Sequence, residues 1–424
     1  MILLLFLLTL LIIIGIPIGY ALGVSGSFYF LVYYPELLML VPERLFSGFN
    51  APLLLALPLF TLMGLLMNEA NLTCRLIDLL MIFVGKIRGA LGIATVLVSM
   101  IFGGISGSSV SDTASVGAVL IPEMRKKGYS ADFACGLTVV SNTMGMIIPP
   151  SIPMLLYASI TSQSVGKLFM GGVMPGILIA VFLSIITVFI AKKDNIPLVK
   201  VNMDRKNIML TFKEGIVALV MPVFVIGSIV LGIATSTEAA AGGVLYALVV
   251  GLFVYRTLKL KAIIRVLKGT VRMSATVMII IAFSNMYTWM LSLEQIPEKL
   301  LLLVNTINLS PEGFLLIFGV IILLAGTFLD VAPGIILLTP VFYPAIISLG
   351  ISPIQFGVLL IVGSAIGLIT PPVAVCINVA SAISKMSMNS IFKASLPFLV
   401  ADLIVMILVC LVPGISTWIP SFFK

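Results

Sequence analysis

The sequence contains no histidine, which excludes every mechanism that needs an imidazole base or an imidazole metal ligand. Charged residues are also scarce: Asp, Glu, Lys and Arg together make up 9% of the 424 residues, whereas hydrophobic residues make up 61%. A typical soluble domain has about 25% charged residues and lacks apolar runs of this length. The composition therefore predicts an all-α polytopic membrane protein and excludes a soluble one.

Cysteine motifs and nucleotide-binding motifs are missing as well. The four cysteines, Cys74, Cys135, Cys376 and Cys410, are far apart and form no CxxC pair, so neither a disulfide framework nor a zinc site is indicated. No GxxxxGK[ST] phosphate loop occurs, which disfavours ATP-driven transport. The N-terminus has no basic n-region and no obvious cleavage site, so residues 2–22 are predicted to form the first membrane helix.

The net charge of +8 would suggest nucleic acid as the partner of a soluble chain, but here the basic residues stand in short loops between apolar segments. Cytoplasmic loops of membrane proteins carry this excess, so we expect a lipid bilayer and no nucleic acid around the chain. The run from Arg256 to Arg272 has six basic residues and no acid, and it is predicted to be one such loop. Outside the polar stretches described next, membrane or interfacial segments are expected at 2–22, 25–41, 52–68, 74–85, 168–191, 215–233, 238–255, 273–293, 297–308 and 393–413.

Polar residues interrupt the apolar sequence twice in the first half, as GGISGSSVSDTASVG and then as SNTMGMIIPPSIP. The apolar arms around the first interruption, 90–106 and 113–124, are shorter than the ~20 residues of a full crossing, and basic residues flank both. The arms therefore predict a re-entrant helical hairpin over about 90–124. The second interruption lies at the centre of 130–160, which is long enough for one crossing made of two half-helices.

A similar pattern recurs in the second half of the chain. In each half an aspartate precedes a proline by ten residues, and a glycine precedes a Pro-Pro pair by twenty-one. Chance similarity between two apolar sequences is common, but the retained spacings favour an internal repeat. The residues concerned are Asp112 with Pro122, Gly128 with Pro149, Asp330 with Pro340, and Gly350 with Pro371.

The repeat predicts a division of the chain into two halves of opposite topology. The first repeat is expected at 1–192, a basic cytoplasmic linker at 193–213 and the second repeat at 214–424. The second repeat carries a hairpin over about 311–348 and a broken helix over about 352–384. Inverted repeats with broken helices that meet at the membrane midplane are typical of secondary transporters.

Hairpin tips and helix breaks offer partial charges to ions. Half-helix C-termini and unwound carbonyls attract a cation, while half-helix N-termini offer N–H groups to an anion. Hydroxyl and amide oxygens complete a shell that suits sodium, so we expect two sodium sites, each between one tip and one break. The predicted ligands of the first site are Ser106, Ser108, Asp112, Thr113, Asn142 and Gly145, and Thr143 is expected to face the same tip. Those of the second are Gly326, Thr327, Asp330, Gly363, Gly367 and Thr370, with Ser364 nearby.

An anionic substrate is expected between the tips, close to Ser109, Asp330, Asn142 and Ser151. The alternative for any single serine or glycine is that small residues merely let membrane helices approach and hydrogen-bond locally. The clusters taken together favour a binding site.

Aspartates inside membrane segments are considered separately. A charge is costly to bury there, so an ionisable residue in such a segment is by default a hypothesis for a functional site. Asp112 and Asp330 could each bind a cation, carry a proton, or cap the second arm of a hairpin. Glu238, in ATSTEAAAGG, is predicted to cap the start of a helix. Asp402 lies well inside the last span and is expected to face a partner helix.

Four stretches of the chain carry a family resemblance. GGISGSSVSDTASVGAVLIPEMRKKGY, SNTMGMIIPPSIPMLLYA, TSTEAAAGGVLYAL and GLITPPVAVCINVA resemble the large membrane subunit of tripartite ATP-independent periplasmic (TRAP) transporters. The resemblance covers essentially the whole chain. It implies a sodium-coupled importer of small carboxylates, such as sialic acid or C4-dicarboxylates, in which the hairpins and broken helices move like an elevator against the other helices.

The resemblance also implies partners and a location. A small four-helix membrane subunit is expected as a separate polypeptide, and a soluble periplasmic binding protein is expected to deliver the acidic substrate. The assembly would lie in the bacterial inner membrane, and sodium ions would be co-transported rather than held as a resident cofactor.

Two alternatives from other classes remain at this point. An intramembrane aspartyl hydrolase could use Asp112 and Asp330 as a dyad that shares a proton, although the sequence contains no GxGD motif. A channel is the other alternative, and the two opposed hairpins argue against it because they favour alternating access.

Overall fold

The computed structural model describes residues 2–196 and 205–423, and every regular element within these ranges is a helix. Within the same ranges, eight helices are long and apolar enough to cross a membrane, which confirms the predicted fold class. These candidate spans are Pro52–Glu69, Ala131–Thr161, Val165–Lys193, Ile208–Val230, Ser236–Val254, Leu260–Leu293, Val331–Ser348 and Met388–Leu411.

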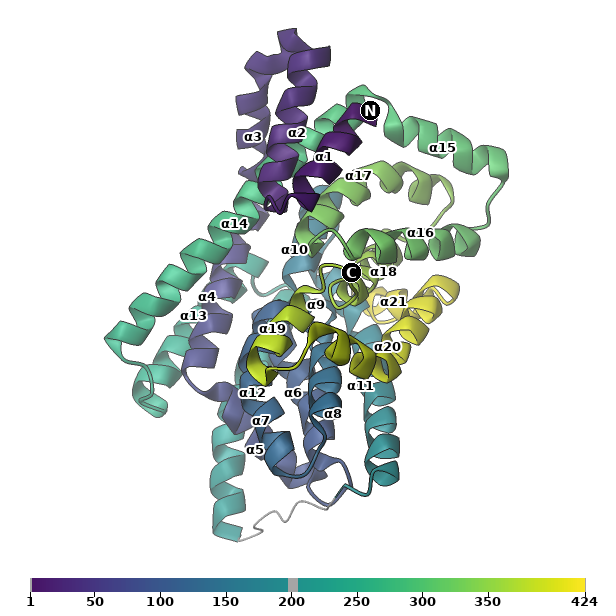
Figure 1. Ribbon diagram of the computed structural model, residues 1–424. Helices are drawn as coiled ribbons and strands as arrows, with labels where there is room; N and C mark the ends of the chain where they lie inside the picture. The colour runs from purple at the N-terminus through teal and green to yellow at the C-terminus, as the bar shows by residue number, and fades with distance from the viewer. Residues whose placement is uncertain (1, 197–204, 424) are drawn as a thin grey trace.

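The N-terminus folds differently from the prediction. Two short helices, α1 (Ile2–Ile13) and α2 (Ile18–Tyr33), replace the continuous helices expected over 2–22 and 25–41. Pro17 explains the break, because it is the N-cap of α2 and has no backbone N–H to continue α1. The two helices form a hairpin whose turn points into the body of the molecule (Figure 1).

The next elements descend from this hairpin to the lower end of the view in Figure 1 and lead into the first predicted re-entrant hairpin. The connecting elements are η1 (Pro35–Leu40), α3 (Val41–Phe49), η2 (Pro52–Leu55), α4 (Ala56–Glu69) and α5 (Leu72–Val84).

The first hairpin consists of α6 (Ala90–Ser106) and α7 (Ser109–Lys126). The first broken helix follows as α8 (Ala131–Ser141), the single turn α9 (Met144–Ile147) and α10 (Ile152–Thr161). Helix α6 packs against α7, α8 and α9, so the hairpin tip and the break lie together.

The second half repeats this order. Helices α16 (Pro311–Gly326) and α17 (Val331–Ser348) form the second hairpin, and α18 (Pro353–Gly367) and α19 (Val375–Ser384) form the second broken helix. The two hairpins and two broken helices of the predicted fold class are therefore present. Helix α18 is central to the fold, because every residue from Gln355 to Gly367 is buried, as expected of a helix that is apolar on all sides.

Helix α14 (Leu260–Leu293) begins earlier than the sequence predicted. The run Arg256–Arg272, predicted to be a loop, is helical from Leu260 onward and extends the helix to 34 residues. At 1.5 Å per residue this helix is roughly 50 Å long, more than the ~30 Å hydrocarbon core needs, so its basic end reaches beyond the apolar layer. The predicted linker 193–213 is also shorter than expected, because α12 begins at Arg205; its residues 197–204 lie outside the described residues.

The remaining helices complete two packed groups. Helix α4 packs against α13 and α14, while α14 also contacts α2 and α3. In the second group, α20 packs against α8, α18 and α11. These remaining elements are α11 (Val165–Lys193), α12 (Arg205–Val230), α13 (Ser236–Val249), the π-helical turn η3 (Val250–Val254), α15 (Ile296–Ile307), α20 (Met388–Leu411), α21 (Gly414–Thr417) and η4 (Pro420–Phe422).

Candidate functional site

The first hairpin tip is a tight turn between α6 and α7. Gly107 ends α6 with a φ of 62°, a conformation that glycine adopts without strain. Ser108 is the N-cap of α7, where its hydroxyl accepts a hydrogen bond from the Ser111 N–H at 3.4 Å. Asp112 lies one turn into α7, so the capping role considered for Asp112 belongs to Ser108 instead.

The Asp112 carboxylate is completely buried at this tip. Its Oδ1 accepts a hydrogen bond from the Ser106 hydroxyl, whereas its Oδ2 has no hydrogen-bond partner among the described residues. Gly145 of the first break lies so close that a Cβ there would overlap Oδ2, and a Cβ at Gly103 would lie 3.3 Å from it. A buried carboxylate without a cationic partner is costly, so the free oxygen is suited to bind a cation.

Asn142 connects the break to both arms of the first hairpin. Its side-chain Oδ1 accepts a hydrogen bond from Ser99 at 2.8 Å, and its Nδ2 donates one to Thr113 at 3.3 Å. Its backbone carbonyl accepts from the Ser109 hydroxyl at 2.6 Å. The structure therefore brings together most of the first predicted set. Ser99 was missed because it stands alone in an apolar arm; its spacing of four residues from Gly103, on the same helix face, was the available signal.

Two other residues of the first break face elsewhere. Ser151 is the N-cap of α10 and donates to the Met146 carbonyl at 2.5 Å, so its hydroxyl is engaged in holding the break. The expectation that Thr143 faces the tip is wrong. Its hydroxyl lies 3.0 Å from Asp402 Oδ2 of α20, which confirms that Asp402 faces a partner helix.

The second tip is built mainly from backbone. A Cβ on Gly326 would lie 3.0 Å from the Gly367 Cα, so the tip and the second break are in direct backbone contact. Thr327 and Thr370 each donate their hydroxyl to a carbonyl of their own helix at 2.8 Å. Gly363 lies next to Ile322 of α16, where a Cβ would overlap the isoleucine side chain.

Asp330 caps the second arm, since its Oδ1 accepts from the Val331 N–H at 2.8 Å. Unlike Asp112 it is exposed, and it borders two cavities of about 250 Å³ each. No Lys or Arg stands among the residues that line either cavity. The turn between α1 and α2 forms the opposite wall, with Gly15, Ile16 and Pro17, so the N-terminal hairpin reaches the second tip.

The two tips approach each other through α19. This helix packs against α7 of the first hairpin. Its buried Cys376 lies next to Thr113, and both Asp112 and Asp330 are close enough to interact electrostatically with the thiol. Both tips therefore lie near the start of α19.

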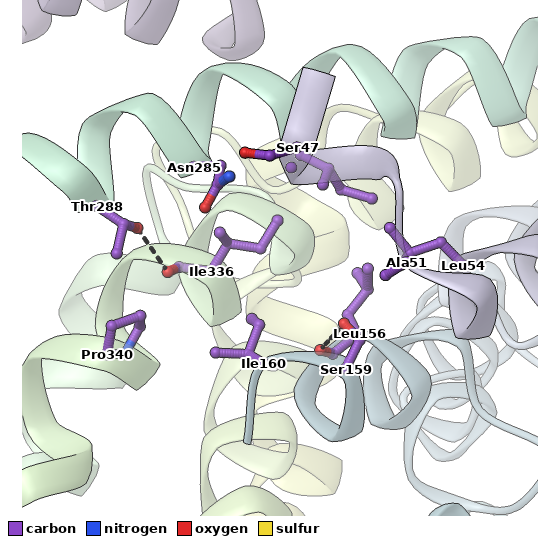
Figure 2. A pocket seen from close by; sticks show the side chains of 12 residues that line it. Ser47, Ala51, Leu54, Leu156, Ser159, Ile160, Asn285, Thr288, Ile336 and Pro340 are labelled. Atoms are coloured by element: carbon purple, nitrogen blue, oxygen red, sulfur yellow. Dashed lines mark hydrogen bonds between the residues drawn. The ribbon is translucent and has the colours of Figure 1, made fainter. Parts of the chain in front are cut away.

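A larger cavity of about 370 Å³ separates α10 and α17 from α3 and α14 (Figure 2). Its wall on α14 carries Asn285 and Thr288, and Thr288 donates to the Ile336 carbonyl of α17 at 3.3 Å. Ser159 lies beside Leu156 on the α10 side, and Pro340 lies across the cavity on α17. The hairpin and broken-helix group thus contacts α14 directly through α17, and this cavity interrupts the interface.

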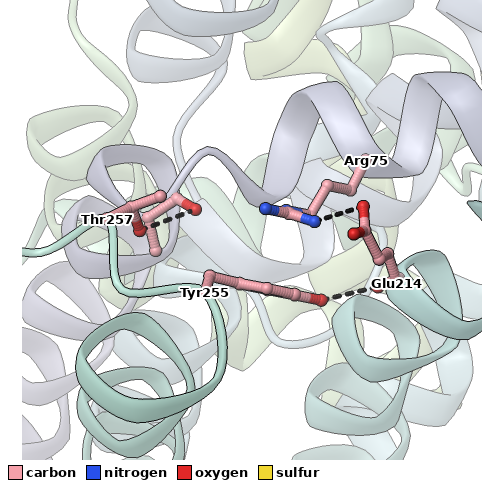
Figure 3. Close-up of polar contacts among 5 residues, drawn as sticks. Arg75, Glu214, Tyr255 and Thr257 are labelled. Carbon is pink, nitrogen blue, oxygen red and sulfur yellow. Dashed lines mark hydrogen bonds and ion pairs between the residues drawn. The ribbon is translucent and has the colours of Figure 1, made fainter.

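A polar cluster anchors α5, the helix that precedes the first hairpin (Figure 3). Arg75 forms an ion pair with Glu214 of α12, and its guanidinium lies 3.7 Å from the centre of the Tyr255 ring. The Tyr255 hydroxyl donates to the Glu214 carbonyl at 2.5 Å. Burial, and to a lesser extent the Glu214 carboxylate, raise the pKa of the neighbouring Asp78, which Arg75 partly opposes. The cluster fixes α5 to α12.

Comparison with known proteins identifies the family. Residues 5–415 match the family model described as "Tripartite ATP-independent periplasmic transporter, DctM component". The chain belongs to this family.

Individual relatives support the assignment over nearly the full length. The chain is 37% identical to the C4-dicarboxylate TRAP transporter large permease protein DctM of Pseudomonas aeruginosa, with 95% of this chain and 94% of the relative covered. It is 34% identical to the sialic acid TRAP transporter large permease protein SiaM of Vibrio cholerae, with 96% of each covered. Among solved structures, the YdaH transporter of Alcanivorax borkumensis has a TM-score of 0.62 at 15% identity, covering 91% of this chain and 88% of that one, which shows a common fold.

Membership in the TRAP permeases decides between the classes considered from the sequence. These proteins are transporter components, so the aspartyl hydrolase alternative is not supported. The geometry agrees, because Asp112 contacts Ser106 inside the first tip whereas Asp330 caps α17 beside separate cavities. The chain is a multi-pass membrane protein of a TRAP transporter.

Proposed function

We propose that this TRAP permease is a sodium-coupled importer of a small carboxylate, such as sialic acid or a C4-dicarboxylate. The observation that carries the proposal is the buried Asp112 carboxylate, whose Oδ2 has no partner and lies against the break at Gly145. Such an oxygen, beside hydroxyls and unwound backbone, suits a hard monovalent cation. A sodium ion bound there would neutralise the carboxylate and hold the tip against the break.

The first sodium site would be formed by Asp112 with Ser106, Asn142 and Gly145, with Ser108 and Thr113 at its edge. The second would use mainly backbone oxygens, because its threonine hydroxyls already donate to carbonyls. Gly326, Thr327, Gly367 and Thr370 are its candidates, with Asp330 at the cavity edge and Gly363 one turn away. Two different sites would let each ion order one hairpin.

The substrate would bind between the tips, near Ser109, Asn142 and Asp330, with Ser151 stabilising the break behind them. The cavities at Asp330 have no basic residue in their walls, so a carboxylate must be recognised by N–H groups at helix starts and by the bound cations. This requirement explains why sodium would have to bind before an anionic substrate.

Transport would follow an elevator mechanism, in which the hairpins and broken helices move as one body against α4, α12, α13 and α14. The cavity among α10, α17 and α14 supports this division, because it leaves part of the surface between the two groups loosely packed. A separate four-helix small subunit would complete the static part, a periplasmic binding protein would deliver the substrate, and the complex would lie in the bacterial inner membrane.

Reconstitution tests the proposal. Proteoliposomes that contain this chain and its small subunit are given an inward sodium gradient and a labelled carboxylate, with and without the binding protein. The expected result is accumulation that needs both sodium and the binding protein, and Asp330→Ala should abolish it. Uptake that is indifferent to sodium, or undiminished in Asp330→Ala, would contradict the proposal.

A further inference from the structure

The last membrane helix contains one acidic residue, and it is completely buried. Asp402 lies near the middle of α20 and is 0% exposed. Its Oδ2 lies 3.0 Å from the Thr143 hydroxyl of the first break, and its Oδ1 has no hydrogen-bond partner among the described residues. The proposed sodium and substrate sites do not use this carboxyl group, because Thr143 points away from the first tip.

Within residues 2–196 and 205–423, no charged group forms an ion pair with Asp402. Helix α20 packs against α8, α11, α16, α18, α19 and α21. Among the described residues, Thr143 is the only one whose side chain interacts with the Asp402 carboxyl. The titratable residues on these helices, on α20 itself and at the end of α19 are Asp132, Cys135, Lys167, Lys192, Lys193, Glu312, Cys376, Lys385, Lys393 and Cys410.

The Thr143 hydroxyl has a single hydrogen, and this decides whether Thr143 or Asp402 is the donor in the hydrogen bond between them. The Thr143 Oγ1 also lies 2.7 Å from the Val140 carbonyl, which can only accept a hydrogen bond. A hydroxyl has one hydrogen, and the shorter contact to Val140 takes it. The Thr143 oxygen is then left with lone pairs facing Asp402, so the hydrogen between Thr143 and Asp402 must come from the carboxyl group.

Burial leads to the same conclusion independently. An ionised carboxylate here would lack any cation and would leave one oxygen without a hydrogen bond, at a cost of several kcal/mol. A neutral carboxylic acid donates from Oδ2 to Thr143 and leaves only a carbonyl oxygen unpaired, which costs far less.

We propose that Asp402 is a proton-binding site: in this conformation it is a neutral acid whose Oδ2–H donates to Thr143 and holds α20 against the first break. Loss of the proton at alkaline pH places a bare charge between α8 and α20. The break and the first tip are joined through Asn142, next in sequence to Thr143, so transport should fall as Asp402 ionises. Protons would thus regulate a cycle that sodium drives.

Infrared difference spectroscopy on the purified full chain in lipid nanodiscs tests the protonation state directly. The wild-type spectrum minus that of Asp402→Asn, at neutral pH, should contain the C=O stretch of a protonated carboxylic acid. The band should shift in frequency in Thr143→Val, which removes the acceptor, and remain in place in Thr143→Ser. Asp132→Asn is the matched control, because it removes an exposed aspartate of α8 and should leave the band in place.

The pH profile of sodium-driven uptake gives the second readout. Wild-type uptake should fall by up to about tenfold per pH unit above the midpoint of Asp402, whereas the permanently neutral amide of Asp402→Asn should abolish this fall. Carboxylate bands in place of the carboxylic acid band, or an alkaline fall that persists in Asp402→Asn, would overturn the proposal. The infrared result does not depend on sodium coupling, whereas the pH profile rests on the proposed function, so a failure of this proposal can be distinguished from a failure of the proposed function.

Discussion

The two hairpin tips share a sequence pattern but lie in different surroundings. At the first, Asp112 is fully buried, bonded to Ser106 on one oxygen and free on the other. At the second, Asp330 has the same spacing to a proline but is exposed, caps its helix and borders two cavities. A repeated aspartate therefore does not imply a repeated role.

The difference arises from where each second arm begins. Helix α7 starts three residues before Asp112, so the carboxylate points from inside a helical turn toward the break. Helix α17 starts one residue after Asp330, so the same residue type is the cap and faces outward. One additional helical turn separates a cap that borders a cavity from a buried carboxylate, which we propose as a cation ligand. We therefore expect the Asp112 side chain to govern sodium affinity at the first tip and the Asp330 side chain to govern substrate recognition, while backbone oxygens of the second tip hold the second sodium ion.

The strongest test of this division is Asp112→Asn. The substitution keeps the shape of the side chain but removes the charge that we assign to sodium. Losing an ionic interaction of this kind costs about 2–3 kcal/mol, so the sodium concentration that gives half-maximal uptake should rise by roughly 30- to 150-fold. Asp132→Asn is the control, because it removes an exposed carboxylate of the neighbouring helix. An unchanged sodium requirement would show that the first tip does not bind the coupling ion.

A second test changes the space around the free oxygen instead of its charge. In Gly145→Ala the new Cβ would overlap Asp112 Oδ2, so the ion would lose room and sodium affinity should fall by about tenfold or more. Gly334→Ala on α17 is the matched control, because nothing lies within 4 Å of the added methyl. Thermal unfolding of both variants separates a local effect from misfolding. Wild-type sodium affinity in well-folded Gly145→Ala would contradict the assigned geometry.

At the second tip, Asp330→Asn should act on the substrate. The neutral amide keeps the cap acceptor for the Val331 N–H but changes the charge at the cavity wall. We expect the KM for the carboxylate to change by about tenfold, equivalent to about 1.4 kcal/mol, with a much smaller change in half-maximal sodium. A shift in sodium affinity as large as that of Asp112→Asn would show that the two tips are equivalent.

The smallest effect is expected from Ser99→Ala. The substitution removes one hydrogen bond to Asn142 Oδ1, worth about 1 kcal/mol, so sodium affinity should fall by roughly fivefold. Ser115→Ala on α7 is the comparison, because that hydroxyl donates only to carbonyls of its own helix. Equal effects of the two substitutions on half-maximal sodium would remove Ser99 from the site.

The sequence predicted the arrangement better than the orientation of single side chains. Short apolar arms and repeated glycine and proline spacings were enough for both hairpins and both broken helices, because membrane-spanning length and backbone satisfaction leave few solutions. They could not show that Thr143 faces α20, because a one-residue step rotates a side chain by about 100° around the helix. The break at Pro17 was overlooked because hydropathy alone does not register the missing N–H of one proline.

Ser99 and Asp402 show the other limit. Each is a polar residue with apolar neighbours on both sides in its helix, and its role depends on a partner more than forty residues away or in the other half of the chain. The sequence immediately around Ser99 or Asp402 does not indicate which distant residue each one contacts.

Sodium-specific stabilisation of the purified protein tests the central claim most directly. The unfolding midpoint of wild type, Asp330→Asn and Asp112→Asn is measured in NaCl and in KCl of equal ionic strength, since an ion that binds only the folded state raises the midpoint. We predict a higher midpoint in NaCl for wild type and Asp330→Asn, and a clearly smaller difference between the salts for Asp112→Asn, which keeps only the backbone site at the second tip. Equal midpoints of the wild type in both salts, or a full sodium effect in Asp112→Asn, would contradict sodium binding at the first tip.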